Sequence, residues 1–421
     1  MCKSNSLPEN LLREARQMRN EIAAWRRDIH QHPELSFQEV RTTAFVAEKL
    51  RAWGLGNVRT GFGPLKTGVE ASIGEGHPCV ALRADMDALP IEEKTGLDYS
   101  SQNPGVSHAC GHDAHTAVLL AAARLLKARE EEIKGRIKFI FQPAEETRTK
   151  IFEKPLSGAG YVVRSGAIDD VDALFGMHVW GVFDGGVAFV KPGPTMMASG
   201  RFNLKIIGKG THGASPHLGV DPITAECQIV EGIQTVVSRE VSPLEPRLIT
   251  IGTIHGGTAT NIVPQEVELS GTIRAAKEEV VRFMGERLGQ VAAETAHAHR
   301  CRSEYSLLIN GPAVVNDADM VQIVRESAAQ VLGTERVRSV EMLTGSEDFR
   351  EYSSRRPSAL WFMGMKRPER GIGQPQHDPC FLVDEEILPD AAAVMAACAF
   401  NYLQQKSPGV LASDGAGMKG G

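Results

Sequence analysis

The sequence predicts an α/β protein of two domains, and three observations lead to this prediction. The chain has 421 residues and a mass of 45.6 kDa, which is more than one hydrophobic core usually supports. In its first part, short apolar runs typical of buried strands alternate with helical patterns. From about residue 189 the predicted order becomes β-α-β-β-α-β, the split βαβ arrangement of a compact two-layer domain.

Two helices are predicted near the N-terminus, over residues 11–29 and 39–53, both with amphipathic apolar spacing. A polar break with the sequence HQHPE separates them, and its Pro33 cannot continue a helix. His30 and His32 lie in this break. They are candidate neighbours of a metal, but histidines at a helix end more often form local hydrogen bonds.

A buried strand is predicted at residues 79–83, and Asp85 and Asp87 follow it. Two carboxylates just past a strand end are placed to orient the imidazole of a metal ligand. A helix cap or an Asx turn would explain them equally well, so both interpretations stay open.

The richest chemistry lies between residues 108 and 146. This stretch begins with HACGHDAH and ends with PAEE, which together supply a thiolate, several imidazoles and two adjacent carboxylates. Divalent metals such as zinc accept these ligand types. A helix at 116–129 and a strand at 138–141 are predicted between the two clusters. Ligands collect beyond the carboxyl ends of strands in α/β sheets, so the two clusters are predicted to form one site.

His178 is a further candidate ligand. The predicted strand at residues 171–176 ends just before Met177 and His178. A histidine at a strand end is usually structural. This strand, however, is the third in succession to end in carboxylate or metal-competent side chains, which favours His178 as a ligand.

The split βαβ domain is predicted to interrupt the first domain. Its strands are expected at 199–208, 247–256, 263–274 and 302–309, and its helices at 221–239 and 277–297. The first domain then resumes with a helix at 319–332, a strand at 359–363, a loop carrying His377 and a helix at 388–404. The predicted domains are therefore 1–188 with 310–405, and 189–309. The Gly, Ser and Ala-rich tail at 406–421 is predicted to be disordered.

Composition limits the possible partners and compartments. The net charge is -6, and no run of Lys or Arg offers the footprint that nucleic acid or an anionic membrane requires. No apolar stretch is long enough for a signal peptide or a membrane span, so a cytoplasmic protein is expected. The seven cysteines are odd in number and form no C-x-x-C, which is typical of free thiols in a reducing compartment.

Nine motifs, in order, give the chain a family resemblance. They are RRDIHQHPE, ALRADMDALPIEE, HACGHDAHTA, FQPAEE, GMHVW, THGASPHLGVDPI, GGTATNIVPQEVELSGTIR, GSEDF and HDPCFLVDEEIL. With these motifs the chain resembles the amidohydrolases of peptidase family M20, within them the branch of hippurate hydrolases and auxin-conjugate hydrolases. The resemblance implies a zinc-peptidase-like catalytic domain with an inserted ferredoxin-like lid that usually carries the dimer contact.

The resemblance also implies the roles of individual residues. The metal ligands would be Cys110, His112, Glu146, His178 and His377. Glu145 would be the general base. Substrate-side roles fall on His212, Asn261 and Arg274 of the lid and on Gly345 of the catalytic domain. Two departures concern the substrate: residues 147–155 form a longer, charged run where close relatives have a shorter, Gly-rich one, and Ala114 stands where Gly is usual.

The number of candidate ligands points to the chemistry. Five ligands are too many for one tetrahedral zinc with an open position and too few for two closed sites, so they suit two divalent metals that share a bridging water or carboxylate. Zinc or manganese is expected, with cobalt or nickel as alternatives. Adjacent residues at a strand end point in different directions. One carboxylate as ligand and its neighbour as base is therefore the natural division, and the resemblance implies Glu146 for the ligand and Glu145 for the base.

The resulting prediction is cleavage of an N-acyl amino acid, aromatic or aliphatic in its acyl group, to a carboxylic acid and a free amino acid. His212 would stabilise the oxyanion, and Arg274 and Asn261 would bind the substrate carboxylate. Arg274 and Asn261 lie in the predicted lid, so they could instead be a solvated charge and part of a turn.

Three alternatives remain. In a cysteine hydrolase, Cys110 would be the nucleophile and His112 its base, but the Glu-Glu pair, His178 and His377 would have no role. In a binding protein without activity, Glu145 would be dispensable, yet it is present. The third keeps the metals and acts on another C–N bond, in a dipeptide or in the hydrolytic deamination of an aromatic amine.

Overall fold

The computed structural model describes residues 6–149 and 155–406. The tail predicted to be disordered, apart from Lys406, and residues 150–154 of the charged loop lie outside these ranges. The chain divides into two compact units. The first unit comprises Met1–Gly193, Val315–Glu341 and Glu351–Gly421, and the second comprises Pro194–Val314 and Met342–Arg350.

One placement differs from the sequence-based expectation. Gly345 was expected in the catalytic domain, but it belongs to the second unit. Backbone hydrogen bonds explain this, because Met197 N donates to Gly345 O at 2.9 Å and Leu343 N donates to Thr195 O at 2.9 Å.

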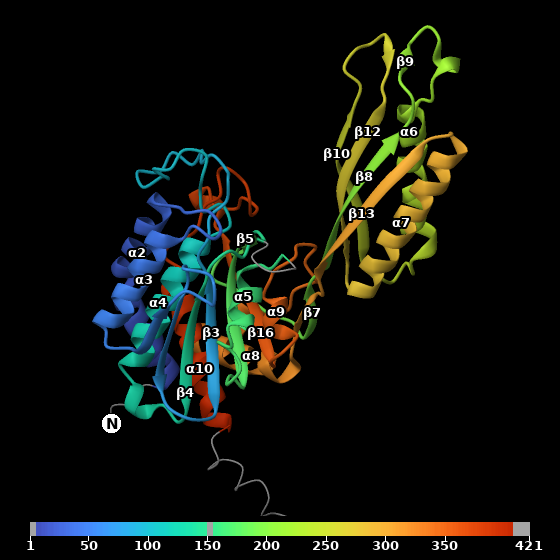
Figure 1. The fold of residues 1–421 in the computed structure, drawn as a ribbon. Coiled ribbons are helices and arrows are strands. Elements are labelled where there is room, and N and C mark those ends of the chain that lie inside the picture. The colour runs from blue at the N-terminus through green and yellow to red at the C-terminus, as the bar shows by residue number, and fades with distance from the viewer. Residues whose placement is uncertain (1–5, 150–154, 407–421) are drawn as a thin grey trace, which may run out of the picture. The chain divides into compact units, whose positions relative to one another are not determined.

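An eight-stranded sheet forms the centre of the first unit, in the order β1-β2-β4-β3-β5-β16-β6-β15. Figure 1 labels its strands β4, β3, β5 and β16. Strands β3, β4, β5 and β16 are parallel neighbours in its middle. Every residue of β3 is buried, as expected for a parallel strand covered on both faces. The strands are β1 (Gly56–Thr60), β2 (Val69–Gly74), β3 (Cys79–Asp85), β4 (Arg136–Gln142), β5 (Ala173–Asp184), β6 (Ala188–Phe189), β15 (Val337–Arg338) and β16 (Ser358–Lys366).

Helices pack around this sheet, and α4 and α10 contact both each other and β3. The single helix predicted at 11–29 is instead two helices that meet at Met18, whose ψ of 3° departs from helical geometry. The helices are α1 (Leu7–Gln17), α2 (Arg19–Gln31), α3 (Val40–Ala52), α4 (His112–Lys127), α5 (Gly158–Arg164), α8 (Ala318–Leu332), α9 (Arg350–Ser353) and α10 (Leu388–Lys406).

Strand β5 is longer than the predicted 171–176, and this length matters for the site. It pairs with β3 only as far as Gly176, which lies opposite Arg83. On its other side it stays paired with β16 through Trp180, and Asp184 pairs with Lys366. His178 therefore lies inside the strand rather than after its end, at a level where β5 has no further partner on the β3 side.

A four-stranded antiparallel sheet, in the order β10-β12-β8-β13, forms the second unit with two helices. The chain order is β8-α6-β10-β12-α7-β13, which confirms the predicted split βαβ arrangement. Its elements are β8 (Ala198–Ile207), α6 (Pro222–Thr235), β10 (Arg247–Gly256), β12 (Glu266–Ala275), α7 (Glu278–Ala298) and β13 (Arg302–Gly311). Four short strands form two further pairs, β9 with β11 and β7 with β14. They are β7 (Gly193–Met196), β9 (Thr211–His212), β11 (Ile262–Val263) and β14 (Val314–Asn316).

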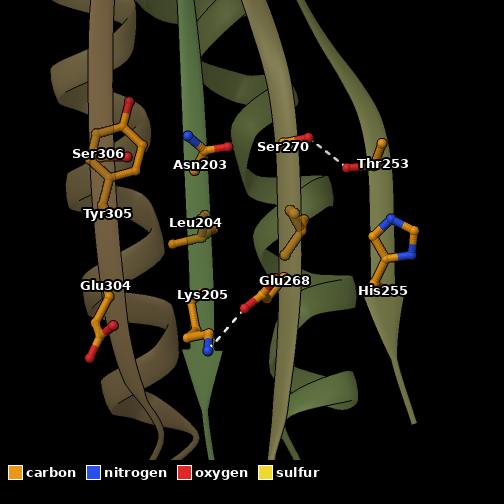
Figure 2. A pocket seen from close by; sticks show the side chains of 11 residues that line it. Asn203, Leu204, Lys205, Thr253, His255, Glu268, Ser270, Glu304, Tyr305 and Ser306 are labelled. Carbon is orange, nitrogen blue, oxygen red and sulfur yellow. Dashed lines mark hydrogen bonds and ion pairs between the residues drawn. The ribbon is translucent and has the colours of Figure 1, made fainter. Parts of the chain in front are cut away.

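The core of the second unit lies on one face of its sheet. Phe202, Leu204 and Ile206 of β8 pack with Ile229 of α6 and Leu288 of α7. The opposite face of the sheet carries polar and charged side chains (Figure 2). None of the described helices is long and apolar enough to cross a membrane. All six cysteines in the described part of the chain are free thiols.

Candidate active site

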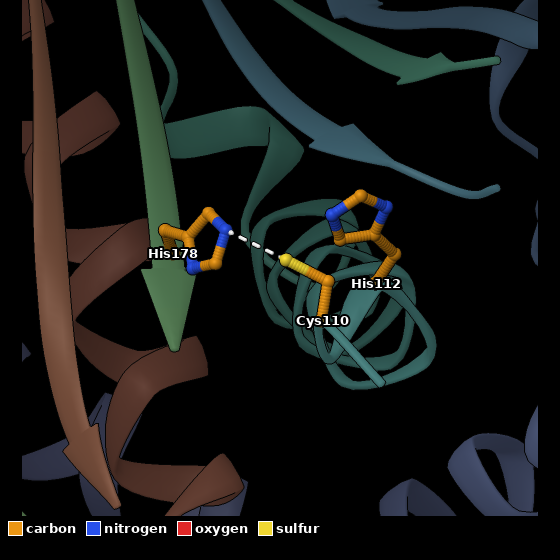
Figure 3. A group of neighbouring side chains, drawn as sticks. All are labelled: Cys110, His112 and His178. Atoms are coloured by element: carbon orange, nitrogen blue, oxygen red, sulfur yellow. Dashed lines mark hydrogen bonds between the residues drawn. The ribbon is translucent and has the colours of Figure 1, made fainter. Parts of the chain in front are cut away.

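A left-handed glycine brings the first two candidate ligands to β5. Gly111 precedes α4 with a φ of 86°, and a Cβ placed there would lie 2.4 Å from Val179 Cγ2. Only glycine fits this close approach without strain. As a result, Cys110 Sγ lies 3.5 Å from His178 Nε2, and His112 lies beside both (Figure 3).

Both imidazoles of this group present one ring nitrogen to the same space. His178 Nδ1 donates to Val179 O at 2.6 Å, which leaves Nε2 facing Cys110. His112 Nδ1 lies 3.2 Å from Asp87 Oδ1, and its Nε2 is buried with no hydrogen-bond partner among the described residues. A buried ring nitrogen without a partner is rare, and a metal ion would satisfy it.

The remaining candidate ligands lie on the other side of Cys110. His377 Nε2 is 3.1 Å from Glu146 Oε1, and the backbone N of His377 donates to Ala109 O at 2.8 Å. Three groups of side chains have all their donor atoms within 4.8 Å of one another: Cys110 with His112 and His178, Cys110 with Glu146 and His377, and His112 with Glu145 and Glu146. The structure thus brings all five predicted ligands and Glu145 together, with Cys110, His112 and Glu146 each shared between two groups.

Asp87 connects β3 to the Glu-Glu pair. Besides facing His112, it accepts hydrogen bonds from Glu145 N at 3.0 Å and Glu146 N at 3.1 Å. Ser36 Oγ donates to it at 2.6 Å. Burial acts to raise the pKa of Asp87, but the hydrogen bonds from His112 and Ser36 hold it below its usual value. A charged Asp87 therefore orients both an imidazole and the backbone that carries the two glutamates.

Asp85 and His115 form a second buried pair that the motifs did not single out as a unit. Asp85 Oδ1 lies 2.6 Å from His115 Nδ1, and Arg83 Nη1 donates to Asp85 Oδ2 at 2.8 Å. His115 Nε2 accepts from Val179 N at 2.8 Å. Asp85, His112 and His115 also have donor atoms within 4.8 Å of one another. Both nitrogens of His115 are therefore engaged, and Asp85 is held by His115 and Arg83, so neither is free to bind metal. Through Val179, His115 fixes β5 at the residue next to His178.

Glu39 is another participant that the sequence did not reveal. It is fully buried, and its Oε1 accepts from Ala144 N at 2.8 Å, at the turn just before Glu145. Burial and the nearby Asp87 raise the pKa of Glu39 to about 8. Glu39 is the first residue of the helix predicted at 39–53, and the sequence gave no signal of this contact, which depends on the tertiary fold.

The histidines at the end of α2, His30 in its last turn and His32 as its C-cap, both have hydrogen-bond partners. His30 Nδ1 lies 2.7 Å from Asp113 Oδ2, and His30 Nε2 lies 3.2 Å from Glu93 Oε1. His32 Nδ1 lies 2.8 Å from Asp28 O. Both are hydrogen-bonded histidines at a helix end, His32 within its own helix and His30 through Asp113, the residue next to the candidate ligand His112.

Two pKa shifts bear on the chemistry of this group. Burial and the nearby Glu146 raise the pKa of the Cys110 thiol, so Cys110 needs a nearby cation to become the thiolate that a metal ligand requires. Burial and the neighbouring His115 hold the pKa of His178 well below its usual range. A neutral His178 keeps the lone pair that a metal ligand requires.

The candidate substrate residues lie in the second unit. His212 of β9 pairs with Ile262 of β11, and Gly213 N donates to Asn261 O at 2.7 Å, so His212 and Asn261 are neighbours. His212 Nδ1 accepts from Ala214 N at 3.0 Å, which places the ring proton on Nε2. Arg274 lies on the long strand β12, and its Nη1 is buried without a hydrogen-bond partner in the described ranges.

Comparison with known proteins identifies the family. Residues 81–401 match the model of peptidase family M20/M25/M40. The chain is 37% identical over 414 residues to IAA-amino acid hydrolase ILR1-like 4 of Arabidopsis thaliana, covering 96% of this chain and 91% of the relative. It is 38% identical over 406 residues to N-acetyl-L-cysteine deacetylase of Bacillus subtilis, covering 96% of this chain and 91% of the relative.

A solved structure agrees with this assignment. The YXEP protein of Bacillus subtilis, described as a dinuclear metal binding peptidase from the M20 family, superimposes with a TM-score of 0.77 at 34% identity. The match covers 92% of this chain and 99% of that chain. The chain belongs to peptidase family M20/M25/M40, and its relatives place it on the amidohydrolase branch.

Proposed function

We propose that this protein is a metal-dependent amidohydrolase that cleaves an N-acyl amino acid to a carboxylic acid and a free amino acid. The observation that carries this proposal is the position of Glu145, next to Glu146, where five ligand-competent side chains converge. The names of the relatives, an IAA-amino acid hydrolase and an N-acetyl-L-cysteine deacetylase, support the substrate class.

Two divalent metal ions are the proposed cofactors, with zinc or manganese favoured and cobalt or nickel as alternatives. The ligands would be Cys110, His112, Glu146, His178 and His377. Two observations support the fit: the unpartnered buried Nε2 of His112, and the sharing of Cys110 between two separate groups of donors. When bound, the metals supply Lewis-acid activation of water and of the amide carbonyl.

The side chains then perform the proton transfers. Glu145 takes a proton from the attacking water and returns it to the leaving nitrogen, so that its charge is restored at the end of the cycle. Asp87 keeps the backbone of Glu145 and Glu146 in register through two N–H bonds. His212 donates from Nε2 to the developing oxyanion, in line with the tautomer that Ala214 N selects.

Substrate binding is assigned to the second unit. Arg274 would hold the carboxylate of the amino-acid half through its planar fork, assisted by Asn261 and Gly345. A homodimer formed through this unit is proposed as the assembly. Leu218 and Ile262 support it, because they are 61% and 52% exposed in the chain alone. We also propose a cytoplasmic location.

A hydrolysis screen tests the proposed function. The stripped protein receives zinc, manganese or cobalt and is offered acetyl, benzoyl and indolyl-acetyl amino acids, with the Glu145→Gln variant as the matched control. We expect turnover of at least one acyl class by the loaded wild type and its loss in the variant. Equal rates in the two proteins would reject Glu145 as base, and no hydrolysis under any metal would reject the substrate class.

A second candidate is cleavage of a short peptide. One relative supports it: thermostable carboxypeptidase 1 of Saccharolobus solfataricus is 37% identical over 405 residues, covering 94% of this chain and 99% of the relative. Dipeptides in the same screen separate the two, since a peptidase would turn them over faster than the acyl amino acids.

A further inference from the structure

The sheet of the second unit has one face packed on α6 and α7 and an open face that carries polar and charged side chains. The open face has two regions that differ in charge. Toward one end lies a pocket of about 560 Å³ (Figure 2). In it Lys205 Nζ lies 2.9 Å from Glu268 Oε1 and 3.0 Å from Glu266 Oε1. The lysine in this region is therefore paired within the protein, and carboxylates outnumber it.

Further along the same face lie two arginines, Arg201 of β8 and Arg274 of β12. Arg201 stands opposite Thr272, and Arg274 is two residues further along β12, opposite Ser199. Side chains two residues apart point to the same face of a strand, so the two arginines are diagonal neighbours on the open face. Diagonal neighbours are typically about 7 to 8 Å apart.

Neither arginine has an acidic partner in the described part of the chain. Arg274 Nη1 is buried with no hydrogen-bond partner, and Arg201 forms no ion pair. The positions around them across the strands are neutral: Leu308 lies opposite Arg201, Leu248 opposite Arg274 and Thr250 opposite Thr272. Burial and the nearby Arg201 lower the pKa of Arg274, as expected for two adjacent cations.

Such a pair is unfavourable in the free protein, because two like charges at this separation repel each other. A bound anion removes that penalty and supplies acceptors for both guanidinium forks. We propose that Arg201 and Arg274 bind an amino-acid half with two carboxylates, Arg274 holding the α-carboxylate and Arg201 the side-chain carboxylate. N-acyl derivatives of aspartate or glutamate would then be preferred substrates. This inference rests on the proposed function, since it extends the role proposed for Arg274.

The separation of the two arginines favours two carboxylates over one. A single guanidinium fork already satisfies both oxygens of one carboxylate in the bidentate geometry. A second fork on the neighbouring strand needs acceptors of its own. The side-chain carboxylate of aspartate or glutamate supplies them, whereas the amides of asparagine and glutamine match its shape without its charge.

The experiment compares kcat/KM of the metal-loaded full chain on N-acyl glutamate, glutamine and alanine, and on the aspartate and asparagine pair. The acyl group is the best one from the hydrolysis screen. The variants are Arg201→Gln and Arg201→Lys, with Lys205→Gln as the matched control, a cation on the same strand and face. The thermal midpoint of each variant is measured in parallel.

Wild type should prefer each acid over its amide, and Arg201→Gln should lower that ratio by about 10 to 100-fold, as expected for loss of a charge-assisted hydrogen bond. Arg201→Lys should keep part of the preference, Lys205→Gln should keep all of it, and Arg201→Gln should not lower the thermal midpoint. An equal fall of kcat/KM on all substrates, or an acid preference that Arg201→Gln leaves unchanged, would overturn this inference and leave the proposed function standing. Absence of hydrolysis of every N-acyl amino acid, alanine included, would instead overturn the proposed function and this inference with it.

Discussion

The tautomers of three buried histidines explain how the candidate metal site is prepared. His178 and His112 each have Nδ1 hydrogen-bonded, one to Val179 O and the other to Asp87, so each presents Nε2. His115 uses both nitrogens, one toward Asp85 and one toward Val179 N. Two of the histidines are thus available as ligands, and the third holds the strand that carries His178.

His115→Ala should separate positioning from metal binding. The change leaves the buried Val179 N–H without its acceptor, which should cost about 1 to 3 kcal/mol of unfolding free energy. Because His178 is the neighbour of Val179, metal affinity should also fall, by about 10 to 100-fold. Thermal unfolding of the metal-free protein and metal titration measure the two effects. Loss of metal with no change in the stability of the metal-free protein would mean that His115 is itself a ligand.

Proton release on metal binding should depend on His377. Hydrogen bonds with Cys110 and Glu146 raise the pKa of His377 to about 10, so the ring is protonated near pH 7 in the metal-free protein. This proton must leave before the ring can bind a cation. Metal affinity should therefore increase with pH until the pH reaches the pKa of His377. Calorimetry in buffers of different ionisation enthalpy measures the protons released. His377→Ala should release fewer than wild type, and an equal number would contradict His377 as a ligand.

At the residue scale, motifs could predict the candidate ligands but not every contact around them. The five ligands and Glu145 stand in contiguous motifs, and the structure brings them together. Asp85 and Asp87 looked equivalent after a strand end. Only the fold assigns Asp87 to His112 and Asp85 to His115, because Arg83 takes one oxygen of Asp85.

Two elements determine where the candidate site forms. Strand β5 extends past its partner β3, which exposes His178 to the start of α4. Alternation of apolar residues could not reveal this length, because the extension is set by pairing with β16. Helix α4 in turn begins at His112 rather than at the predicted residue 116, since its first turn is buried but carries polar side chains that interrupt the apolar pattern.

Gly111→Ala should damage the junction between these elements. The added methyl would lie 2.4 Å from Val179 Cγ2, and the residue would have to keep a φ of 86°. A left-handed non-glycine residue alone costs about 1 to 2 kcal/mol, and the clash adds to it. We expect a lower thermal midpoint and weaker metal binding. Gly76→Ala is the matched control, since Gly76 has a φ of 74° and open space around it. Equal effects of the two changes would show that the contact with Val179 is unimportant.

At the scale of the whole molecule, the order of the predicted strands and helices indicated an inserted domain, and the structure has two compact units. The core of the first unit includes the buried face of α4 and the central strands, and it does not depend on the candidate ligands for its packing. The assignment of Gly345 to the second unit was beyond sequence reasoning, because it rests on hydrogen bonds to residues far away in the chain.

Metal removal should therefore abolish hydrolysis without unfolding the chain. Chelation should leave near-UV circular dichroism largely unchanged and lower the thermal midpoint, since ligands that bind only the folded state stabilise it by mass action. Full activity should return with the metal. Activity that survives complete chelation would favour the cysteine hydrolase, and global unfolding on chelation would mean that the metals hold the first unit together.

The central claim is the division of labour between Glu145 and Glu146, and metal content and turnover of Glu145→Gln and Glu146→Gln test it most directly. Glu145→Gln keeps shape but loses the proton acceptor, so it should retain both metals while turnover falls about 10² to 10⁴-fold or more. Glu146→Gln should lose metal, because an amide oxygen is a poorer ligand for a dication. The account is contradicted if Glu145→Gln loses metal while Glu146→Gln keeps both ions and is merely slower.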